Sequence, residues 1–412
     1  MTPLILAAPD LGDEPELVAA ATLHGLVIAR RSLDAADLLA AAAADTSMAV
    51  AVSAGVPRLS GDLVGRIVAD NRVVVGIAET DEDERRLAAW SVGIVIRHRG
   101  DSVATMAQIA GAMAPASGNA VDPAVAAGFR SSGAVEHTLP AALPDDASGS
   151  SHFIAVWGPT GAPGRTTTAL AVAQSLAARG LAVGVVDADT YAPSMVAQLA
   201  VNADASGLVV ACRQAENGTL NRRTLLAAAR EVSDRLFLIG GLARAERWPD
   251  LREAALRAVW SVAQETFDAV VVDIGSCIEE EGALAHPAGS PLLSSRRNAA
   301  AVTALEAADR ILVTAKSSTL GLTRLLNELP AVTRVNGDAD LTLVLTGRSG
   351  LLATTSISDR LIRQLGVRAR VARMPRDPER LERAIRDGIT PYEAASRRER
   401  RALALLAKGI AA

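Results

Sequence analysis

A loop rich in glycine and proline, between an apolar run and a run of threonines, carries the strongest chemical signal in the chain. It lies within residues 153–174, FIAVWGPTGAPGRTTTALAVAQ. A buried strand that passes through such a loop into a helix offers backbone N–H groups to phosphate oxygens, and a hydroxyl at the loop's end can bind magnesium. The spacing Gly-x4-Gly-Lys-Ser/Thr is not met, because Pro159 replaces the first glycine and Arg165 the lysine. Taken alone, the loop could also be a plain strand-to-helix turn.

Three aspartates follow the loop at the ends of apolar runs. Residues 181–190, LAVGVVDADT, end in Asp187 and Asp189, and residues 267–275, FDAVVVDIG, place Asp273 at the end of another run. Because the carboxyl ends of parallel strands line one crevice of an open α/β sheet, we expect these carboxylates beside the loop, facing magnesium and water. Each aspartate alone could instead be a turn or helix-cap residue. Their combination with the loop predicts a nucleotide-binding fold.

The composition fits a chain built of strand–helix layers. Of the 412 residues, 50% are hydrophobic but only 2% aromatic, so the cores must consist of Ala, Val, Leu and Ile, as in α/β proteins. The net charge of −4 gives no overall positive field for nucleic acid or anionic lipid. Cys212 and Cys277 form no CxxC pair, which argues against a disulfide framework or a zinc or iron–sulfur motif. With no signal-peptide pattern and no long apolar run, we predict a cytoplasmic protein.

Residues 1–112 are predicted to form a first doubly wound domain. Five apolar runs alternate with four amphipathic stretches from residue 3 to about 97, which implies parallel strands joined by helical crossovers. This pattern resembles a response-regulator receiver domain, whose phosphoacceptor is an acidic residue at the end of the third strand. Here Ser53 stands at that point, so we expect an adaptor or dimerisation module without phosphoacceptor chemistry. Asp10 and Asp13 are interpreted as residues of a solvated loop and a helix N-terminus.

The rest of the chain divides into a linker and a second domain. Residues 113–151 are rich in Ala, Pro, Gly, Ser and Asp without periodicity, which predicts a flexible linker. Residues 152–412 contain a second series of alternating strands and helices that includes the loop. The predicted fold class is therefore α/β with two doubly wound domains, a flavodoxin- or receiver-like domain followed by a P-loop NTPase domain with a mainly parallel sheet.

The loop and the strand ends resemble the MinD/ParA ATPases. Residues 160–167 are similar to their deviant Walker A motif, Lys-Gly-Gly-x-Gly-Lys-Thr-Thr, DADTYAPS at 187–194 to their switch I region, and VVVDIG at 270–275 to their Walker B strand. MPRD at 374–377 resembles the late Pro-x-Asp loop that packs near adenine. With the receiver-like front domain, nearly the whole chain resembles the CpaE/TadZ branch, which serves pilus assembly and septum-site determination.

This resemblance implies the site residues and the partners. The residues that would bind ATP or ADP are Gly161, Ala162, Pro163, Gly164, Arg165, Thr166, Thr167, Pro375 and Asp377. The residues that would hold Mg²⁺, directly or through water, are Thr166, Asp187 and Asp273. Asp189 would orient the attacking water and Arg165 would neutralise developing charge. The implied partners are a second copy of the chain in a nucleotide-dependent homodimer and proteins of pilus, secretion or division machinery.

Two departures from the family pattern leave two interpretations open. Thr160 stands in place of the signature lysine, and Arg165 has a broad planar guanidinium in place of a compact ammonium. The first interpretation is a slow ATPase that acts as a spatial-positioning or assembly factor. The alternative is a catalytically inactive pseudo-ATPase adaptor that works through protein–protein contacts.

The C-terminal segment bears on where in the cell the protein works. Residues 397–406, RRERRALALL, could form a membrane-surface helix like the tail of MinD-type proteins, although a terminal helix packed on its own domain is the simpler interpretation. The resemblance adds peripheral contact with the inner face of the membrane, the poles or the septum to the cytoplasmic prediction. Nucleic-acid binding is not favoured, because no basic domain or aromatic-interleaved patch is present.

Overall fold

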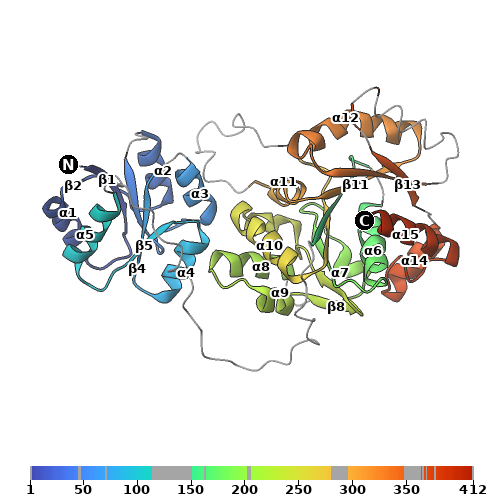
Figure 1. The fold of residues 1–412 in the computed structure, drawn as a ribbon, viewed down its shortest axis with the longest axis horizontal. Coiled ribbons are helices and arrows are strands. Elements are labelled where there is room, and N and C mark those ends of the chain that lie inside the picture. The colour runs from blue at the N-terminus through green and yellow to red at the C-terminus, as the bar shows by residue number, and fades with distance from the viewer. Residues whose placement is uncertain are drawn as a thin grey trace. The chain divides into compact units, whose positions relative to one another are not determined.

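The chain divides into two compact units, Met1–Ala142 and Leu143–Ala412 (Figure 1). Each is considered by itself. The computed structural model describes residues 2–44, 48–69, 72–113, 151–161, 164–201, 206–279, 296–347, 363, 366–367, 369–374 and 377–410. The predicted linker, 113–151, lies outside these ranges except for its two end residues, so its flexibility stays a prediction.

The first unit is a five-stranded parallel sheet with helices between the strands. Its strands are β1 Thr2–Ala7, β2 Leu26–Arg31, β3 Ala49–Ser53, β4 Val74–Ala78 and β5 Ile94–Arg97. Its helices are α1 Glu14–Ala21, α2 Ala35–Ala44, α3 Gly61–Ala69, α4 Asp81–Ala89 and α5 Ser102–Met113. The strand order β2-β1-β3-β4-β5 is the flavodoxin-like order. The predicted alternation of strands and helices is therefore confirmed.

Polar side chains gather where β1 and β3 end. Ser53, at the end of β3, is buried, and its hydroxyl donates a hydrogen bond to the carboxylate of the exposed Asp10. Asp13 lies at the N-terminus of α1, as expected, but its carboxylate accepts from Ser102 and lies 3.0 Å from His98 Nε2. Burial alone would raise the pKa of Asp13, but the contacts with Ser102 and His98 outweigh it and lower the pKa. Asp13 is thus tied to the end of β5 and the start of α5.

The second unit is built on an eight-stranded sheet. Its strands are β6 His152–Trp157, β7 Val183–Ala188, β8 Arg230–Ser233, β9 Leu236–Ile239, β10 Ala269–Ile274, β11 Arg310–Lys316, β12 Asp340–Thr346 and β13 Arg370–Met374. The described helices are α6 Arg165–Ala177, α7 Met195–Gln198, α8 Gly207–Glu216, α9 Arg222–Ala228, α10 Glu253–Thr266, α11 Ala299–Glu306, α12 Thr319–Val335, α14 Pro378–Asp387 and α15 Arg397–Ile410. The strand order is β13-β12-β11-β6-β10-β7-β9-β8.

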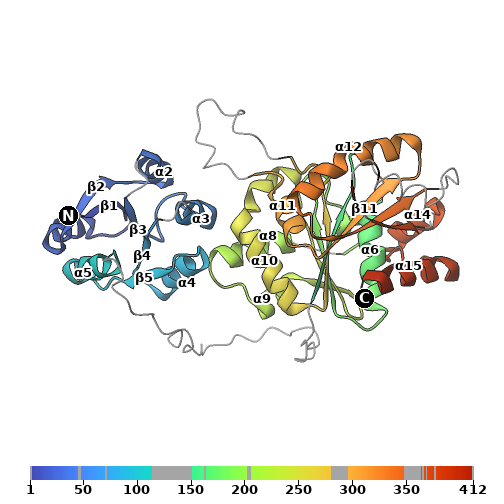
Figure 2. The same ribbon diagram turned by 45° about the horizontal axis from the view of Figure 1, so that its top comes forward.

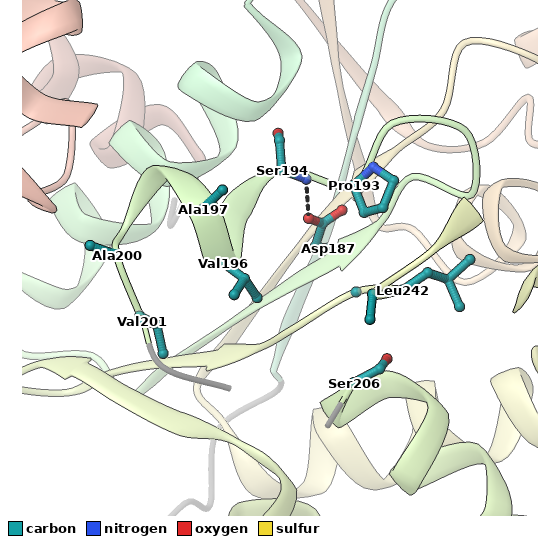
Figure 3. A pocket seen from close by; sticks show the side chains of 11 residues that line it. Asp187, Pro193, Ser194, Val196, Ala197, Ala200, Val201, Ser206 and Leu242 are labelled. Carbon is teal, nitrogen blue, oxygen red and sulfur yellow. Dashed lines mark hydrogen bonds between the residues drawn. The ribbon is translucent and has the colours of Figure 1, made fainter. Parts of the chain in front are cut away.

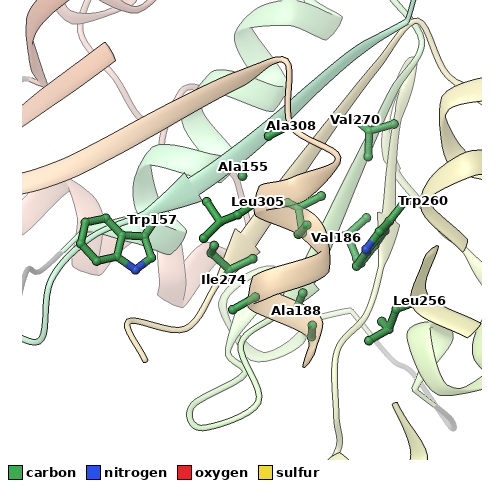
Figure 4. Packing of buried hydrophobic residues seen from close by; sticks show 14 of the residues in the cluster. Ala155, Trp157, Val186, Ala188, Leu256, Trp260, Val270, Ile274, Leu305 and Ala308 are labelled. Atoms are coloured by element: carbon green, nitrogen blue, oxygen red, sulfur yellow. The ribbon is translucent and has the colours of Figure 1, made fainter. Parts of the chain in front are cut away.

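Both faces of this sheet are covered, which explains why its central strands are continuous apolar runs. Along β6, Phe153 and Trp157 enter one core while Ile154 and Val156 enter the other. The first core also holds side chains of α8, α10, α11 and α12, and the Phe153 and Trp260 rings meet edge to face with centroids 5.8 Å apart. Figure 4 shows part of this core. Packing on both faces thus holds the central strands, and with them the residues at their carboxyl ends, in place.

The second core is organised by α6 and α15, which lie against the other face of the sheet (Figure 2). Every residue of α6 from Thr168 to Ala177 is buried, because the helix lies between the sheet and α15. Leu403, Ala407 and Ile410 form the buried face of α15, whereas Leu405 is 72% exposed. No helix within the described ranges is both long and apolar enough to span a bilayer.

The sequence missed one strand. All parallel strands expected in this unit are present, but the antiparallel pairing of β8 with β9 was not anticipated. The segment REVS is short, charged and largely exposed, so it has no apolar alternation to reveal a strand. It ends the sheet at one edge and makes the sheet mainly rather than wholly parallel, as predicted.

Candidate functional site

The loop between β6 and α6 has the backbone geometry that its glycines allow. Gly161 has φ +73° and Gly164 has φ +108°, both in the left-handed region that side chains disfavour. A Cβ atom on Gly164 would lie 3.2 Å from Cγ2 of Thr346, and one on Gly161 would collide with the guanidinium of Arg324. Neither position could accept a larger residue without a local shift. Both glycines are therefore required by the turn itself.

The first turn of α6 follows directly on this loop. Arg165, Thr166 and Thr167 are its first residues, and the Thr168 N–H makes the first helical bond, 2.8 Å to the Gly164 oxygen. Within the part of the chain that the structure describes, no side chain caps this end of the helix. The N–H groups of a first helical turn have no intrahelical acceptors, so they favour an anion at this point.

Two of the three predicted carboxylates lie directly opposite each other. Asp273 on β10 is in register with Asp187 on β7 and with Val156 on β6. Asp189 follows β7 by one residue, and all three aspartates are buried. Because β6, β10 and β7 are neighbours, their carboxyl ends bring these aspartates to the edge where the loop begins. The expected convergence is present.

Asp273 is the most perturbed of the three. Burial raises the pKa of its carboxyl well above the usual value, and the charge of Asp187 raises it further. A hydrogen bond with Thr166 and the charge of Arg165 act in the opposite direction without cancelling the burial. Oδ1 of Asp273 is buried and has no hydrogen-bond partner among the described residues. An unsatisfied carboxylate oxygen in such a place favours a proton or a cation.

Asp187 is already engaged by the backbone that follows it. Its Oδ2 accepts hydrogen bonds from the N–H groups of Ser194 at 2.8 Å and Met195 at 2.9 Å, and its Oδ1 accepts from the Asp189 N–H at 3.4 Å. Burial raises its pKa to about 6, although these bonds act in the opposite direction. Asp187 therefore binds the backbone at the start of α7, which is the role that the helix-cap interpretation of this residue expects.

The two residues predicted to act in catalysis form an ion pair. Nη2 of Arg165 lies 3.0 Å from Oδ2 of Asp189, with the side chains 19% and 5% exposed. Oδ1 of Asp189 accepts from the N–H groups of Tyr191 at 2.9 Å and Ala192 at 3.0 Å. The loop cation is thus held against the strand end rather than turned outward. Nothing in the sequence indicated this pairing.

The late loop is described only in part. Asp377 caps α14 by accepting from the Glu379 and Arg380 N–H groups at 3.1 and 3.3 Å, and these backbone bonds lower its pKa. The strand before it approaches the loop helix, because the Thr168 hydroxyl donates to Met374 Sδ at 3.3 Å. Three predicted binding residues lie outside the described ranges: Ala162, Pro163 and Pro375.

Sequence reasoning missed the contacts that α12 makes with the loop. Arg324 Nη1 donates to the Thr160 oxygen at 3.2 Å, and Oε2 of Glu328 accepts from the Thr160 N–H at 3.2 Å. The Trp157 indole N–H also donates to the Ser276 oxygen at 3.0 Å, which joins the start of the loop to the end of β10. No sequence signal could have found the α12 contacts, because 164 residues separate Arg324 from Thr160.

The residues present fit a magnesium ion that arrives with phosphate. Among the described residues, no three Asp, Glu, His or Cys side chains are arranged to hold a metal by themselves. Magnesium usually takes one or two carboxylates and completes its shell with phosphate oxygens and water. Oδ1 of Asp273, which no described residue binds, and the Thr166 hydroxyl supply such a partial shell.

A separate cavity of about 410 Å³ is lined in part by Asp187 (Figure 3). It is bounded by α7, the start of α8 and the segment after β9, and Val196, Val201 and Leu242 contribute apolar walls. The Asp187 carboxylate accepts from Ser194 at its edge. None of the described residues of the β6–α6 loop lines this cavity, so it is distinct from the expected phosphate site.

Comparison with known proteins concerns the fold. No protein-family model and no curated protein matches the chain. The chain is similar to the ParA family ATPase from Chlorobium tepidum TLS, at 18% identity over 61% of this chain and 98% of that chain, with a TM-score of 0.50. It also resembles the cell division ATPase MinD of Pyrococcus furiosus, at 20% identity over 63% and 98% of the two chains, with a TM-score of 0.48.

A third similar structure is the septum site-determining protein MinD complexed with Mg-ADP from Pyrococcus horikoshii OT3. It is 18% identical over 63% of this chain and 96% of that chain, with a TM-score of 0.46. The share of this chain matched by the ParA family ATPase is larger than the first unit, so the likeness must involve the second. The second unit therefore has a ParA-like α/β fold, which confirms the predicted fold class.

Proposed function

We propose that the chain binds ATP or ADP with Mg²⁺ at the β6–α6 loop and is a slow ATPase of the MinD/ParA kind. The observation that carries this proposal is the buried Oδ1 of Asp273, which finds no partner among the described residues and lies beside the N-terminus of α6, where none of their side chains forms a cap. The left-handed glycines of the loop and the ParA-like fold support it. A magnesium–nucleotide complex would satisfy the helix N-terminus and the carboxylate together.

Each residue near the loop then has a distinct task. Magnesium, when bound, would neutralise phosphate charge, and the Thr166 hydroxyl and the Asp273 carboxylate would hold it. Backbone N–H groups from Gly164 to Thr167 would bind phosphate oxygens. Asp187 keeps its backbone partners, so its predicted part in the magnesium site would run through water.

For hydrolysis, the ion pair between Arg165 and Asp189 would have to open. Arg165 could then turn to the phosphates, and Asp189 could accept a hydrogen bond from the attacking water and so orient it. Opening this mostly buried pair costs free energy that adds to the barrier for hydrolysis, in the same direction as the slow turnover expected from the arginine itself.

The wider role follows from the sequence resemblance. The chain would act as a CpaE/TadZ-like positioning or assembly factor for pilus, secretion or division machinery, through a nucleotide-dependent homodimer. It would work in the cytoplasm, with peripheral contact at the inner face of the membrane, the poles or the septum. The buried face of α15 leaves its arginines and Leu405 as the groups for a membrane contact. Nucleic acid is not an expected partner.

One observation favours the alternative, an inactive pseudo-ATPase adaptor. Both residues predicted to act in catalysis bind each other, and Asp189 also binds two backbone N–H groups. A protein that kept the fold for protein–protein contacts alone could be stabilised by this arrangement. It would use the first unit, in which Ser53 replaces the phosphoacceptor.

Phosphate release from ATP separates the two interpretations. We expect slow release by the wild-type protein and an increase of about tenfold for Arg165→Lys, because a compact ammonium fits close to phosphate oxygens and pairs less firmly with Asp189. Light scattering with ATP and Mg²⁺ should show a dimer. Nucleotide binding without release by either protein, and without a dimer, would support the adaptor instead.

A further inference from the structure

Helix α12, orange in Figure 1, forms two hydrogen bonds with the loop backbone at Thr160. Arg324 donates to the Thr160 oxygen and Glu328 accepts from the Thr160 N–H, each at 3.2 Å. The two side chains are four residues apart and therefore lie on one face of the helix. The N–H group and the carbonyl oxygen of Thr160, which belong to two consecutive peptide bonds, are thus bound by side chains of opposite charge.

Arg324 approaches the loop closely at Gly161. A Cβ atom at this position would meet Nη1 of Arg324, so the guanidinium would have to move for a larger residue to fit. Arg324 is itself exposed, and it contacts the part of the loop that precedes α6. It is thus a second cation beside the phosphate loop, after Arg165.

The charges around the loop make this second cation matter. Arg165 is paired with Asp189, and the carboxylates of Asp187 and Asp273 lie close by. Because Arg165 is already paired with Asp189, a triphosphate entering the site gains from a cation beyond the magnesium that accompanies it. Glu328 adds to the repulsion, and it also occupies an N–H group that an anion could use.

We propose that α12 is a charge gate on the phosphate loop, in which Glu328 holds the Thr160 N–H until a triphosphate displaces it and Arg324 then binds that triphosphate. This inference rests on the proposed function, since it concerns the same site. The gate favours a triphosphate over a diphosphate, because the additional phosphate carries the charge that Arg324 attracts and Glu328 repels.

A purely structural staple would behave differently from a gate. If Arg324 and Glu328 only fixed the loop, removal of either would loosen it and weaken nucleotide binding in both cases. The gate instead requires effects of opposite sign from two residues on one helix face. Because glutamine is a good helix former and Arg324 is exposed, charge can be removed here with little harm to α12.

The test is calorimetric titration of full-length protein with MgATP and MgADP. We expect Arg324→Gln to weaken ATP binding about tenfold and Glu328→Gln to tighten it about threefold, with smaller changes for ADP. Arg324→Lys should recover part of the loss, since it keeps the charge. Arg334→Gln, an exposed arginine farther along the same helix, is the matched control and should bind as the wild type does.

The outcomes separate this inference from the function on which it rests. Wild-type binding with no change in either variant, or with changes of the same sign, would overturn the gate and leave the proposed function intact. A wild-type protein that binds no nucleotide would overturn both. Thermal unfolding of each variant verifies that the compared proteins are equally folded.

Discussion

Asp273→Asn is expected to raise the stability of the nucleotide-free protein at pH 8 by about 1–3 kcal/mol, because it replaces a buried ionisable carboxyl with a neutral amide. Asp273 is 1% exposed, and no described residue forms a hydrogen bond with its Oδ1. At this pH the Asp273 carboxyl must either ionise in a buried position or remain protonated at a pH where an exposed carboxyl would be ionised, and both cost free energy. An amide of the same shape carries no charge, so it avoids this cost.

The pH dependence has a defined sign. The folded pKa of Asp273 lies above its unfolded value, so the protonated carboxyl stabilises the protein fully below about pH 4. That stabilisation is lost as the pH rises through the folded pKa. Asp187, with its pKa raised to about 6, adds a loss between about pH 4 and 6 in the same direction. Asp273→Asn should flatten the part of this slope that lies at higher pH.

Thermal unfolding across this pH range, with and without MgATP, measures both effects. The variant should melt higher than the wild type without ligand and should lose the magnesium-dependent gain that ATP gives the wild type. Asp338→Asn, at an exposed aspartate, is the control and should change neither quantity. A variant that melts lower than the wild type, or that retains the full magnesium effect, would contradict the role given to Asp273.

Arg165→Ala is expected to destabilise the protein by about 3 kcal/mol, because it leaves Asp189 buried without its cation. The pair is short, at 3.0 Å, and Asp189 is only 5% exposed. Two backbone N–H groups still bind Asp189, which keeps the expected loss at the lower end of the range for broken buried pairs.

A double-mutant cycle isolates this pair from the rest of the site. Adding Asp189→Asn to Arg165→Ala should restore most of the lost stability, since the remaining amide needs no cation. Urea unfolding of the wild type, both single variants and the double variant gives the coupling free energy. A double variant as unstable as Arg165→Ala would mean that the arginine stabilises the protein by packing alone.

The elements of both units could be predicted because their signals are local. Apolar runs such as VVVDIG and VGVVD mark buried parallel strands, and the loop residues Gly161 and Gly164 mark a turn that only glycine accommodates. The meeting of Asp187 and Asp273 also followed from the sequence, because parallel strands end at one edge of a sheet.

The partners of each side chain could not be predicted in the same way. The pairing of Arg165 with Asp189 and the contacts of Arg324 and Glu328 with Thr160 depend on where helices and loops settle in three dimensions. Residue types alone predicted that the loop cation would face phosphate. In the folded chain the Arg165 guanidinium lies 3.0 Å from the Asp189 carboxylate, a contact that only the packing of the loop against the end of β7 creates.

The central claim is a magnesium-dependent nucleotide site at the β6–α6 loop, and calorimetric titration of the full-length protein with ATP tests it most directly. With Mg²⁺ present we predict one binding event per chain. With Mg²⁺ removed by a chelator, the affinity should fall by about tenfold or more, because Asp273 and Thr166 then lack the ion that joins them to the phosphates. Absence of binding at every magnesium concentration, or equal binding with and without the ion, would contradict it.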